Sequence, residues 1–220
     1  MTPAPPPKPP SLPRSLPPAT IEDHDLEDDA GFRRLAVGLD LSGRAAELVE
    51  FDQCRFQDAD LSGTTLERAR FTDCEVAKTD LANLRTGRSS MLRVTLTGAR
   101  LTGLQWVDGV LRDVVVSDCR ADLSVFRDTT FRRVVFRDCN LARADFQNAD
   151  LGGAQFVGCD LTGARFSFAT MRGTRLRNCV LAGVGGITSF DGAILAGQDL
   201  IALSYTLAEG LGIQIDDSDD

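Results

Sequence analysis

Six cysteines are the residues of this 220-residue chain whose type could most directly do chemistry. In a reducing compartment they would suggest metal ligands or redox thiols, and in an exported protein an even number permits disulfides. They recur at intervals of 20 residues in two sets, which are Cys54 and Cys74, and Cys119, Cys139, Cys159 and Cys179. What these thiols can do depends on the elements that hold them.

Carboxylates are the second candidate set for chemistry. Five aspartates precede apolar residues and could be paired as catalytic acids and bases, namely Asp60, Asp80, Asp145, Asp150 and Asp160. The single histidine, His24, lies in an acidic run near the N-terminus, so no Ser-His or Cys-His pair can form in the periodic region that follows. No phosphate-binding or dinucleotide-binding glycine motif occurs. We expect no enzymatic activity and no cofactor, and we expect these aspartates to accept hydrogen bonds from backbone N–H groups in turns.

The composition is that of a soluble acidic protein, with 43% hydrophobic residues and a formal net charge of -8. No apolar run approaches the ~20 residues of a membrane span, and the N-terminus lacks a signal-peptide pattern, so we expect a cytoplasmic protein with no membrane partner. The 32 acidic residues outnumber the 24 basic ones, which argues against nucleic acid as a direct partner.

All nine prolines lie between Pro3 and Pro18. A segment of this kind favours extended polyproline II and cannot form a packed core, so residues 1–20 are predicted to be a disordered arm. A ligand for an SH3-type domain is the alternative. Residues 21–48 are interpreted as an acidic lead-in and N-terminal cap.

From residue 49 the sequence has a period of five. Every fifth residue from Phe51 to Leu181 is apolar except Thr86, and the residue two positions earlier is usually small. All 36 charged side chains between residues 49 and 183 fall on the other three positions. Neither an amphipathic helix nor an alternating strand has this period, so two side chains in every five are predicted to point inward.

Blocks such as Ala149-Asp150-Leu151-Gly152-Gly153 and Cys159-Asp160-Leu161-Thr162-Gly163 carry a resemblance. The sequence resembles the pentapeptide repeat family, whose repeat is a small residue, Asp or Asn, Leu or Phe, and two variable residues. The resemblance covers residues 49–183. It implies an all-β fold, a right-handed quadrilateral β-helix of about seven coils, with one pentad on each face and four in each coil.

In such a solenoid the pentad centres fill the axis. The predicted core centres include Phe51, Phe56, Leu61, Phe71, Leu101, Trp106, Phe126, Phe136, Phe146, Phe156, Phe166 and Leu181. Residues 20 apart lie above one another, so the cysteines form straight columns, which favours buried small residues over zinc ligands that must converge tetrahedrally. Trp106 lies one coil above Thr86, and we expect a local bulge across residues 84–106, where Leu84 and Leu104 also enlarge the normally small position.

Residues 184–212 are predicted to be a C-terminal cap with a helix over about 198–209, because Leu200, Leu203 and Leu207 have helical spacing. The helix would cover the open edge of the last coil. In similar pentapeptide repeat proteins the C-terminal segment also forms a dimer interface, so a homodimer is the second interpretation. Residues 213–220 are interpreted as an acidic tail.

Two functions follow from these features. The first is a non-catalytic scaffold that binds a protein partner. The second is implied by the resemblance to quinolone-resistance and toxin-immunity members, and is the binding, inhibition or protection of DNA gyrase or another type II topoisomerase by DNA mimicry. Residues 49–183 carry 19 basic and 17 acidic groups, so the negative charge belongs to the two ends. A mimic needs a sustained negative field, so the charge favours the scaffold.

Overall fold

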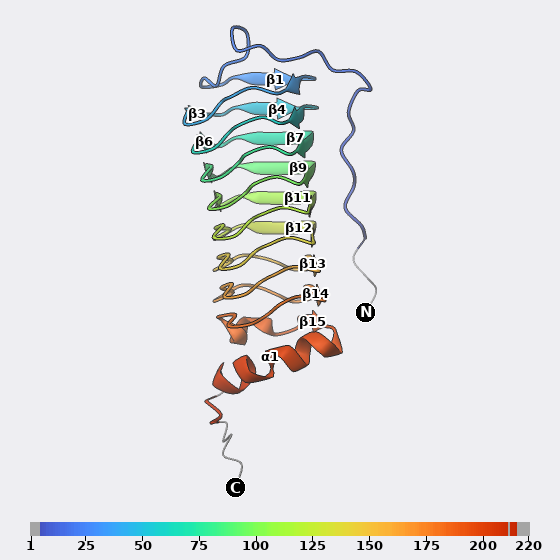
Figure 1. The fold of residues 1–220 in the computed structure, drawn as a ribbon, viewed down its shortest axis with the longest axis vertical. Coiled ribbons are helices and arrows are strands. Elements are labelled where there is room, and N and C mark those ends of the chain that lie inside the picture. Colours follow the sequence, from blue (N-terminus) through green and yellow to red (C-terminus); the bar gives the residue numbers. More distant parts are fainter. Residues whose placement is uncertain (1–4, 211, 215–220) are drawn as a thin grey trace.

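The computed structural model describes residues 5–210 and 212–214, and it is a parallel β-solenoid of about eight turns (Figure 1). Each turn lies on the preceding one, and the helices lie at the C-terminal end. The predicted all-β solenoid is confirmed. No helix among the described residues is long and apolar enough to cross a membrane.

The strands are short because each face of the solenoid holds only one pentad. They are β1 (Gly31–Arg33), β2 (Ala36–Val37), β3 (Ala45–Glu47), β4 (Glu50–Asp52), β5 (Arg55–Gln57), β6 (Thr65–Glu67), β7 (Arg70–Ala77), β8 (Arg85–Gly87), β9 (Ser90–Thr97), β10 (Gln105–Val107), β11 (Val110–Ser117), β12 (Thr130–Arg137), β13 (Gln155–Val157), β14 (Arg175–Arg177) and β15 (Ile194–Leu195). A 3-10 helix, η1 (Ile187–Phe190), precedes β15, and α1 (Gly197–Gly210) follows it.

Between the two ends of the solenoid, neighbouring strands pair in parallel with a register of 20 residues, for example Phe71 with Met91 and Leu111 with Phe131. One sheet follows the order β1-β4-β7-β9-β11-β12-β13-β14-β15, and a second follows β10-β8-β6-β3. The four eight-residue strands bend around a corner and so belong to two faces. The first half of β7 pairs with β4, and the second half pairs with β5.

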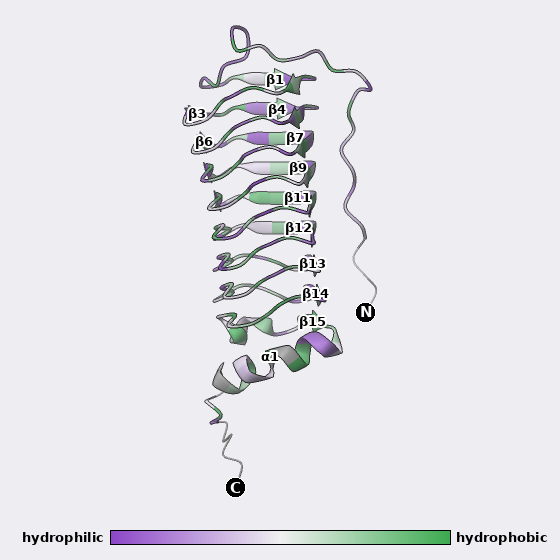
Figure 2. Ribbon diagram, viewed as in Figure 1, coloured by the Kyte–Doolittle hydropathy of each residue, from purple (hydrophilic) through white to green (hydrophobic). Residues whose placement is uncertain are grey.

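The five-residue period places two side chains per pentad on the inside and leaves the charged positions outside. All twelve core centres named from the sequence are buried, with exposed fractions of 4% or less. Figure 2 shows polar and apolar residues interleaved along each coil. The core is therefore a narrow apolar axis inside a charged exterior.

The first turn lies in the segment interpreted as the acidic lead-in and cap, because pairing already begins at β1. Its inward residues are Phe32, Val37, Leu41 and Ala46, all buried. Gly31 pairs with Glu50, so this turn has 19 residues instead of 20. The one-residue shortening breaks the five-residue phase, which is why the sequence predicts about seven coils where the structure has about eight.

The proline-rich segment differs from the predicted disordered arm. Its end joins the first turn, because Ala36 donates a backbone hydrogen bond to the carbonyl of Pro17 over 2.8 Å. Residues 5–17 then lie alongside the solenoid, where Lys8 and Ser11 contact side chains of β11 and β7. The prediction of disorder followed from the fact that the arm cannot form a packed core of its own. The arm is held in another way, because side chains of the solenoid accept hydrogen bonds from its backbone.

The helix predicted over about 198–209 is present as α1. Leu203 is 1% exposed and Leu207 packs against the core, whereas Leu200 is turned outward. The buried carboxylate of Asp199 accepts the backbone N–H groups of Asn178 and Cys179 over 2.9 and 3.2 Å. The helix therefore supplies acceptors to the last coil, which has no further coil to pair with. Of the predicted acidic tail, only residues 213 and 214 lie within the described range.

Candidate functional site

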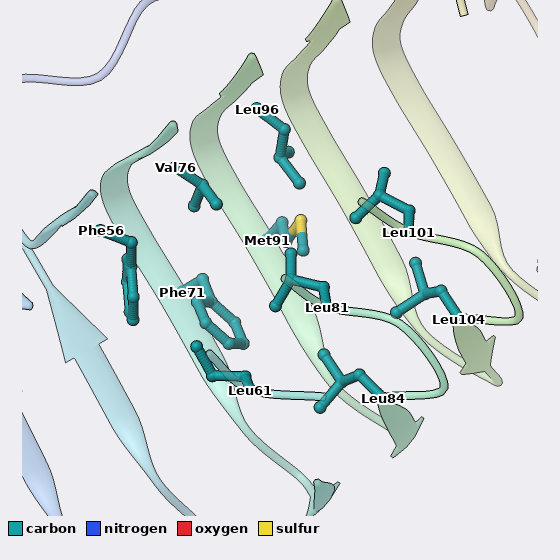
Figure 3. Close-up of a pocket in the computed structure, with 10 residues that line it drawn as sticks. All are labelled: Phe56, Leu61, Phe71, Val76, Leu81, Leu84, Met91, Leu96, Leu101 and Leu104. Atoms are coloured by element: carbon teal, nitrogen blue, oxygen red, sulfur yellow. The ribbon is translucent and has the colours of Figure 1, made fainter. Parts of the chain in front are cut away.

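The axis holds no space for a ligand in the part of the chain that the structure describes. One cavity on the axis encloses about 20 Å³ and is surrounded by leucine, valine, methionine and phenylalanine side chains (Figure 3). Ligand pockets are usually more than ten times larger, and an apolar void of this size stays dry. Binding must therefore use the outer surface.

The cysteine columns are structural. All six thiols are buried and unpaired. The Cys139 Sγ donates to the carbonyl of Val116 over 3.4 Å, and Thr129 makes the same contact with Trp106 over 2.8 Å. Among the described residues, no group of three or more His, Cys, Asp and Glu side chains is placed to hold a metal ion. The small position of the pentad therefore holds a thiol in the same way as it holds a hydroxyl.

Burial also suppresses the reactivity of these thiols, since it raises the pKa of Cys54, Cys74 and Cys179 above its ordinary value. We expect Ellman's reagent to modify none of the six thiols within minutes in the native protein at pH 8, and all six in guanidinium chloride. A fast phase in the native protein would show that one column is accessible.

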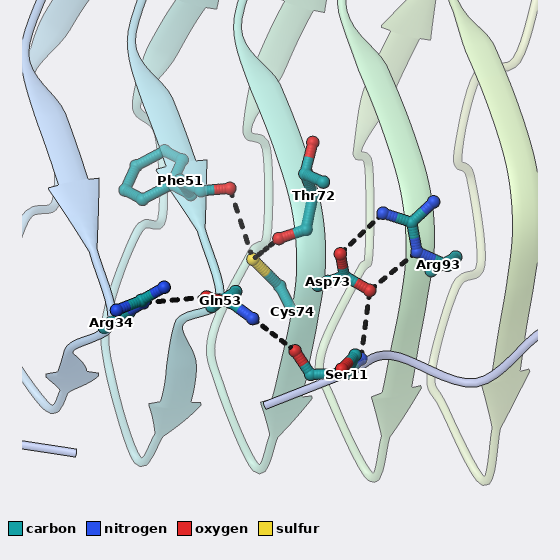
Figure 4. Close-up of polar contacts among 8 residues, drawn as sticks. All are labelled: Ser11, Arg34, Phe51, Gln53, Thr72, Asp73, Cys74 and Arg93. Carbon is teal, nitrogen blue, oxygen red and sulfur yellow. Dashed lines mark hydrogen bonds and ion pairs between the residues drawn. The ribbon is translucent and has the colours of Figure 1, made fainter. Parts of the chain in front are cut away.

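One corner of the solenoid carries a ladder of polar side chains, which we call the corner ladder: Gln53, Asp73, Arg93, Asp113 and Arg133. Figure 4 shows the first three of them. The ladder lies where β7, β9, β11 and β12 bend, and all five residues have φ between 50° and 57°. Arg93 contacts both carboxylate oxygens of Asp73 over 2.7 and 2.5 Å. Arg133 contacts those of Asp113 over 2.6 and 2.7 Å.

The aspartates of these two ion pairs are buried, with Asp73 at 7% and Asp113 at 2% exposure. The hydrogen bonds from Arg93 and Arg133 lower the pKa of the two carboxyls, so both are ionised at neutral pH. The five-residue period did not predict these ion pairs. It places all five side chains outside, and it does not show that residues 20 apart at this corner become buried partners.

A second surface feature is a groove near the C-terminal end, which we call the arginine groove. It has a volume of about 450 Å³ and is lined by β12, β13, β14, β15 and Ala196. Arg137, Arg175 and Arg177 line it, and none of the three forms an ion pair with a described carboxylate. Many arginines elsewhere on the solenoid pair with acidic residues of neighbouring coils, as Arg55 does with Glu75 over 2.8 Å. The groove is therefore a local excess of positive charge.

Two family models match the chain. One, described as "Pentapeptide repeat region", matches residues 89–166, and the other, "Pentapeptide repeats (8 copies)", matches residues 50–85. Together they cover more than half of the 220 residues. The chain belongs to the pentapeptide repeat family. The predicted family is thereby confirmed.

Two solved pentapeptide repeat proteins are among those similar to this chain. HetL, involved in heterocyst differentiation regulation in the cyanobacterium Nostoc sp. strain PCC 7120, is 16% identical, with 76% of this chain and 90% of HetL covered at a TM-score of 0.47. Full-length QnrB1, a plasmid-mediated fluoroquinolone resistance protein, is 22% identical, with 84% and 100% covered at 0.25. No curated protein sequence matches the chain. At these identities the similarity concerns the fold alone.

The aspartates of the pentapeptide repeats have the predicted turn role. In each, the Oδ1 atom accepts the backbone N–H two residues later, at 2.8 Å for Asp60 and Asp80, 2.9 Å for Asp160, and 3.0 Å for Asp145 and Asp150. They therefore organise turns and do not form a catalytic pair in this geometry.

The predicted bulge across residues 84–106 is absent. Trp106 pairs with Thr86 in the regular 20-residue register. The indole fits because Gly109 occupies the small position of the next pentad, where a Cβ atom would lie 2.3 Å from the Trp106 Nε1. The Thr86 Oγ1 and the Trp106 Nε1 are buried without a hydrogen-bond partner among the described residues. The misfit is absorbed by side chains, and the backbone keeps its path.

Proposed function

We propose that this pentapeptide repeat protein is a non-catalytic scaffold that binds an acidic segment of a protein partner in the arginine groove. The observation that supports the proposal is the concentration of Arg137, Arg175 and Arg177 in one groove, with no described carboxylate paired to them. Guanidinium groups bind carboxylates in bidentate geometry, and a cluster that is not neutralised within the chain is available to a partner.

The proposal is tested by quantitative capture of partners from a lysate of the encoding organism. We expect a variant with Arg137→Gln, Arg175→Gln and Arg177→Gln to lose at least nine-tenths of the partner captured by the unchanged protein. The control variant carries Arg33→Gln, Arg70→Gln and Arg88→Gln, which removes the same charge from exposed, ion-paired positions. Equal capture by both variants would contradict the assignment to the groove.

Binding to a type II topoisomerase is the alternative function, motivated by the family. DNA mimicry requires a continuous negative surface, and here the outer charges form ion pairs between coils, such as Arg100 with Asp80 over 3.0 Å. We therefore favour the function of a scaffold for a protein partner over DNA mimicry. Gyrase supercoiling assays with and without a quinolone separate the two, because a mimic inhibits or protects the enzyme at micromolar protein and a scaffold for another partner does neither.

We also propose that a second copy of the chain packs against α1. Its outward side presents Leu200, Ile201 and Tyr205, which are 50%, 76% and 65% exposed, and no described charged side chain interrupts them. An apolar helix face of this kind is typical of an interface. An apolar helix face can pack against the same face of a second copy across a two-fold axis, which is the usual symmetry of homodimers.

Ile201→Glu should convert the dimer to a monomer in sedimentation velocity at micromolar concentration, because each interface would bury two unpaired carboxylates. The control is Val180→Glu, which introduces the same charge at a 53% exposed apolar position on the solenoid. A monomeric unchanged protein, or a dimer in both variants, would contradict the interface.

A further inference from the structure

The proline-rich arm is bound to the corner ladder through its backbone. The N–H of Lys8 donates to the Oδ1 of Asp113 over 3.0 Å, and the N–H of Ser11 donates to the Oδ1 of Asp73 over 2.9 Å. The carbonyl oxygen of Ser11 accepts the Nε2 of Gln53 over 2.8 Å (Figure 4). These contacts join residues 105, 62 and 42 positions apart in the sequence.

The spacing of the two partners matches. Asp73 and Asp113 are two coils apart, which is ~9.6 Å for strands ~4.8 Å apart. Lys8 and Ser11 are three residues apart, which is ~9.3 Å in a polyproline II helix that rises ~3.1 Å per residue. This helix has three residues per turn, so both N–H groups point to the same side. One turn of the arm therefore corresponds to two coils of the solenoid.

The sequence of the arm follows the same register. Proline has no N–H, and among residues 5–11 only Lys8 and Ser11 are not proline, and both of their N–H groups donate to the corner ladder. Three residues before Lys8 stands Pro5, which has no donor. The solenoid residue two coils beyond Asp113 is Gly153, which has no acceptor side chain. The series of N–H donors in the arm and the series of acceptor side chains on the solenoid therefore end at the same level.

The acceptors are built into the corner. Asp73 and Asp113 are each held by a bidentate arginine and are more than nine-tenths buried. By contrast, the aspartates at the next corner of the solenoid, Asp58, Asp118 and Asp138, are exposed. A buried, ionised carboxylate is stable only when its oxygens accept several hydrogen bonds. The arginine donates two of them to each aspartate, and a backbone N–H of the arm donates a third.

We infer that the corner ladder is a binding site for one extended proline-rich segment with a free backbone N–H at every third residue, and that residues 5–17 of this chain occupy it. The arm closes the site to proline-rich segments of other chains. This goes beyond the scaffold function, which concerns the arginine groove at another part of the surface, and the two are tested separately.

The test uses proline as a substitution that removes the donor and keeps the polyproline II conformation. The full chain carrying Lys8→Pro and Ser11→Pro is compared with the full chain carrying Lys8→Ala and Ser11→Ala, which keeps both N–H groups. Trypsin cleavage after Arg14 reports release of the arm, because cleavage follows the population of the open form. Rates are divided by those of isolated peptides of residues 3–18 with the same substitutions.

We expect the proline variant to be cleaved at least tenfold faster than the unchanged protein, and the alanine variant to be cleaved at the unchanged rate. The loss of one hydrogen bond to a buried, charged carboxylate is enough to raise the population of the released arm, and with it the cleavage rate, about tenfold. Equal normalised rates for the proline and alanine variants would overturn the inference. Circular dichroism checks that the solenoid is intact in all three proteins.

A second measurement tests the site itself. A fluorescent peptide of residues 3–18 is titrated into the three full-length proteins and followed by anisotropy. We expect binding to the proline variant, whose site is open, and at least tenfold weaker binding to the other two. A peptide with proline at the positions of Lys8 and Ser11 should bind none of them. Equal binding of the unsubstituted peptide to all three proteins, or to none, would overturn the inference.

Discussion

Replacing Phe146 by alanine should lower the free energy of unfolding by about 3–5 kcal/mol, the usual cost of removing a buried phenylalanine. The ring is fully buried and lies between Phe126 and Phe166, with centroid distances of 5.3 and 5.2 Å and interplanar angles of 12° and 4°. The neighbouring coils are held by the same backbone ladder, so they cannot collapse into the space. Urea unfolding followed by circular dichroism measures the change.

The control for this experiment is Arg165→Ala. Arg165 precedes Phe166, is exposed, and forms no ion pair with a described residue, so the change should stay within about 0.5 kcal/mol. Arg127 is a poor control, because it donates to the buried Asp145 over 2.8 and 2.6 Å. Equal unfolding midpoints for Phe146→Ala and Arg165→Ala would show that the pentad centres do not form the axis.

Replacing Gly109 by alanine should cost about 1–3 kcal/mol, because the new methyl group would overpack the core. The position is unusual, since alanine is common at equivalent positions of other pentads, such as Ala149 and Ala154. The difference comes from Trp106, whose Nε1 would lie 2.3 Å from the new Cβ atom. Urea unfolding again measures the effect.

A double-mutant cycle assigns this cost to the tryptophan. In a Trp106→Leu background the same Gly109→Ala change should cost less, with a coupling of at least about 1 kcal/mol. A residual cost remains, because the carbonyl oxygen of Ser89 would lie 2.8 Å from the methyl group. Additive costs for the two substitutions would mean that Gly109 is required by the backbone and not by the indole.

The regular part of the solenoid was predictable because its pattern is local. A side chain points inward or outward according to its place in the pentad, so Phe136 and Cys139 could be assigned to the core without knowing their neighbours. The same argument failed where the count changed by one, in the 19-residue turn that begins at β1. A periodic pattern contains no information on where it will slip.

The surface was less predictable, because its properties depend on which residues become neighbours. Arg93 and Arg137 have the same charge, but one is paired with a carboxylate of the preceding coil and the other lines a groove. The sequence places both outside and does not distinguish them. Only the stacking of coils decides which charges are neutralised.

Sequence alone predicted the inward residues and the structural role of the cysteines, because each follows from a steric rule that acts within one pentad or between pentads 20 residues apart. The tertiary structure alone placed the proline-rich arm. Its contacts with Asp73 and Asp113 join residues 62 and 105 positions apart, through backbone N–H groups that every residue but proline possesses. Such donors leave no mark in a sequence until the surface that receives them has been folded.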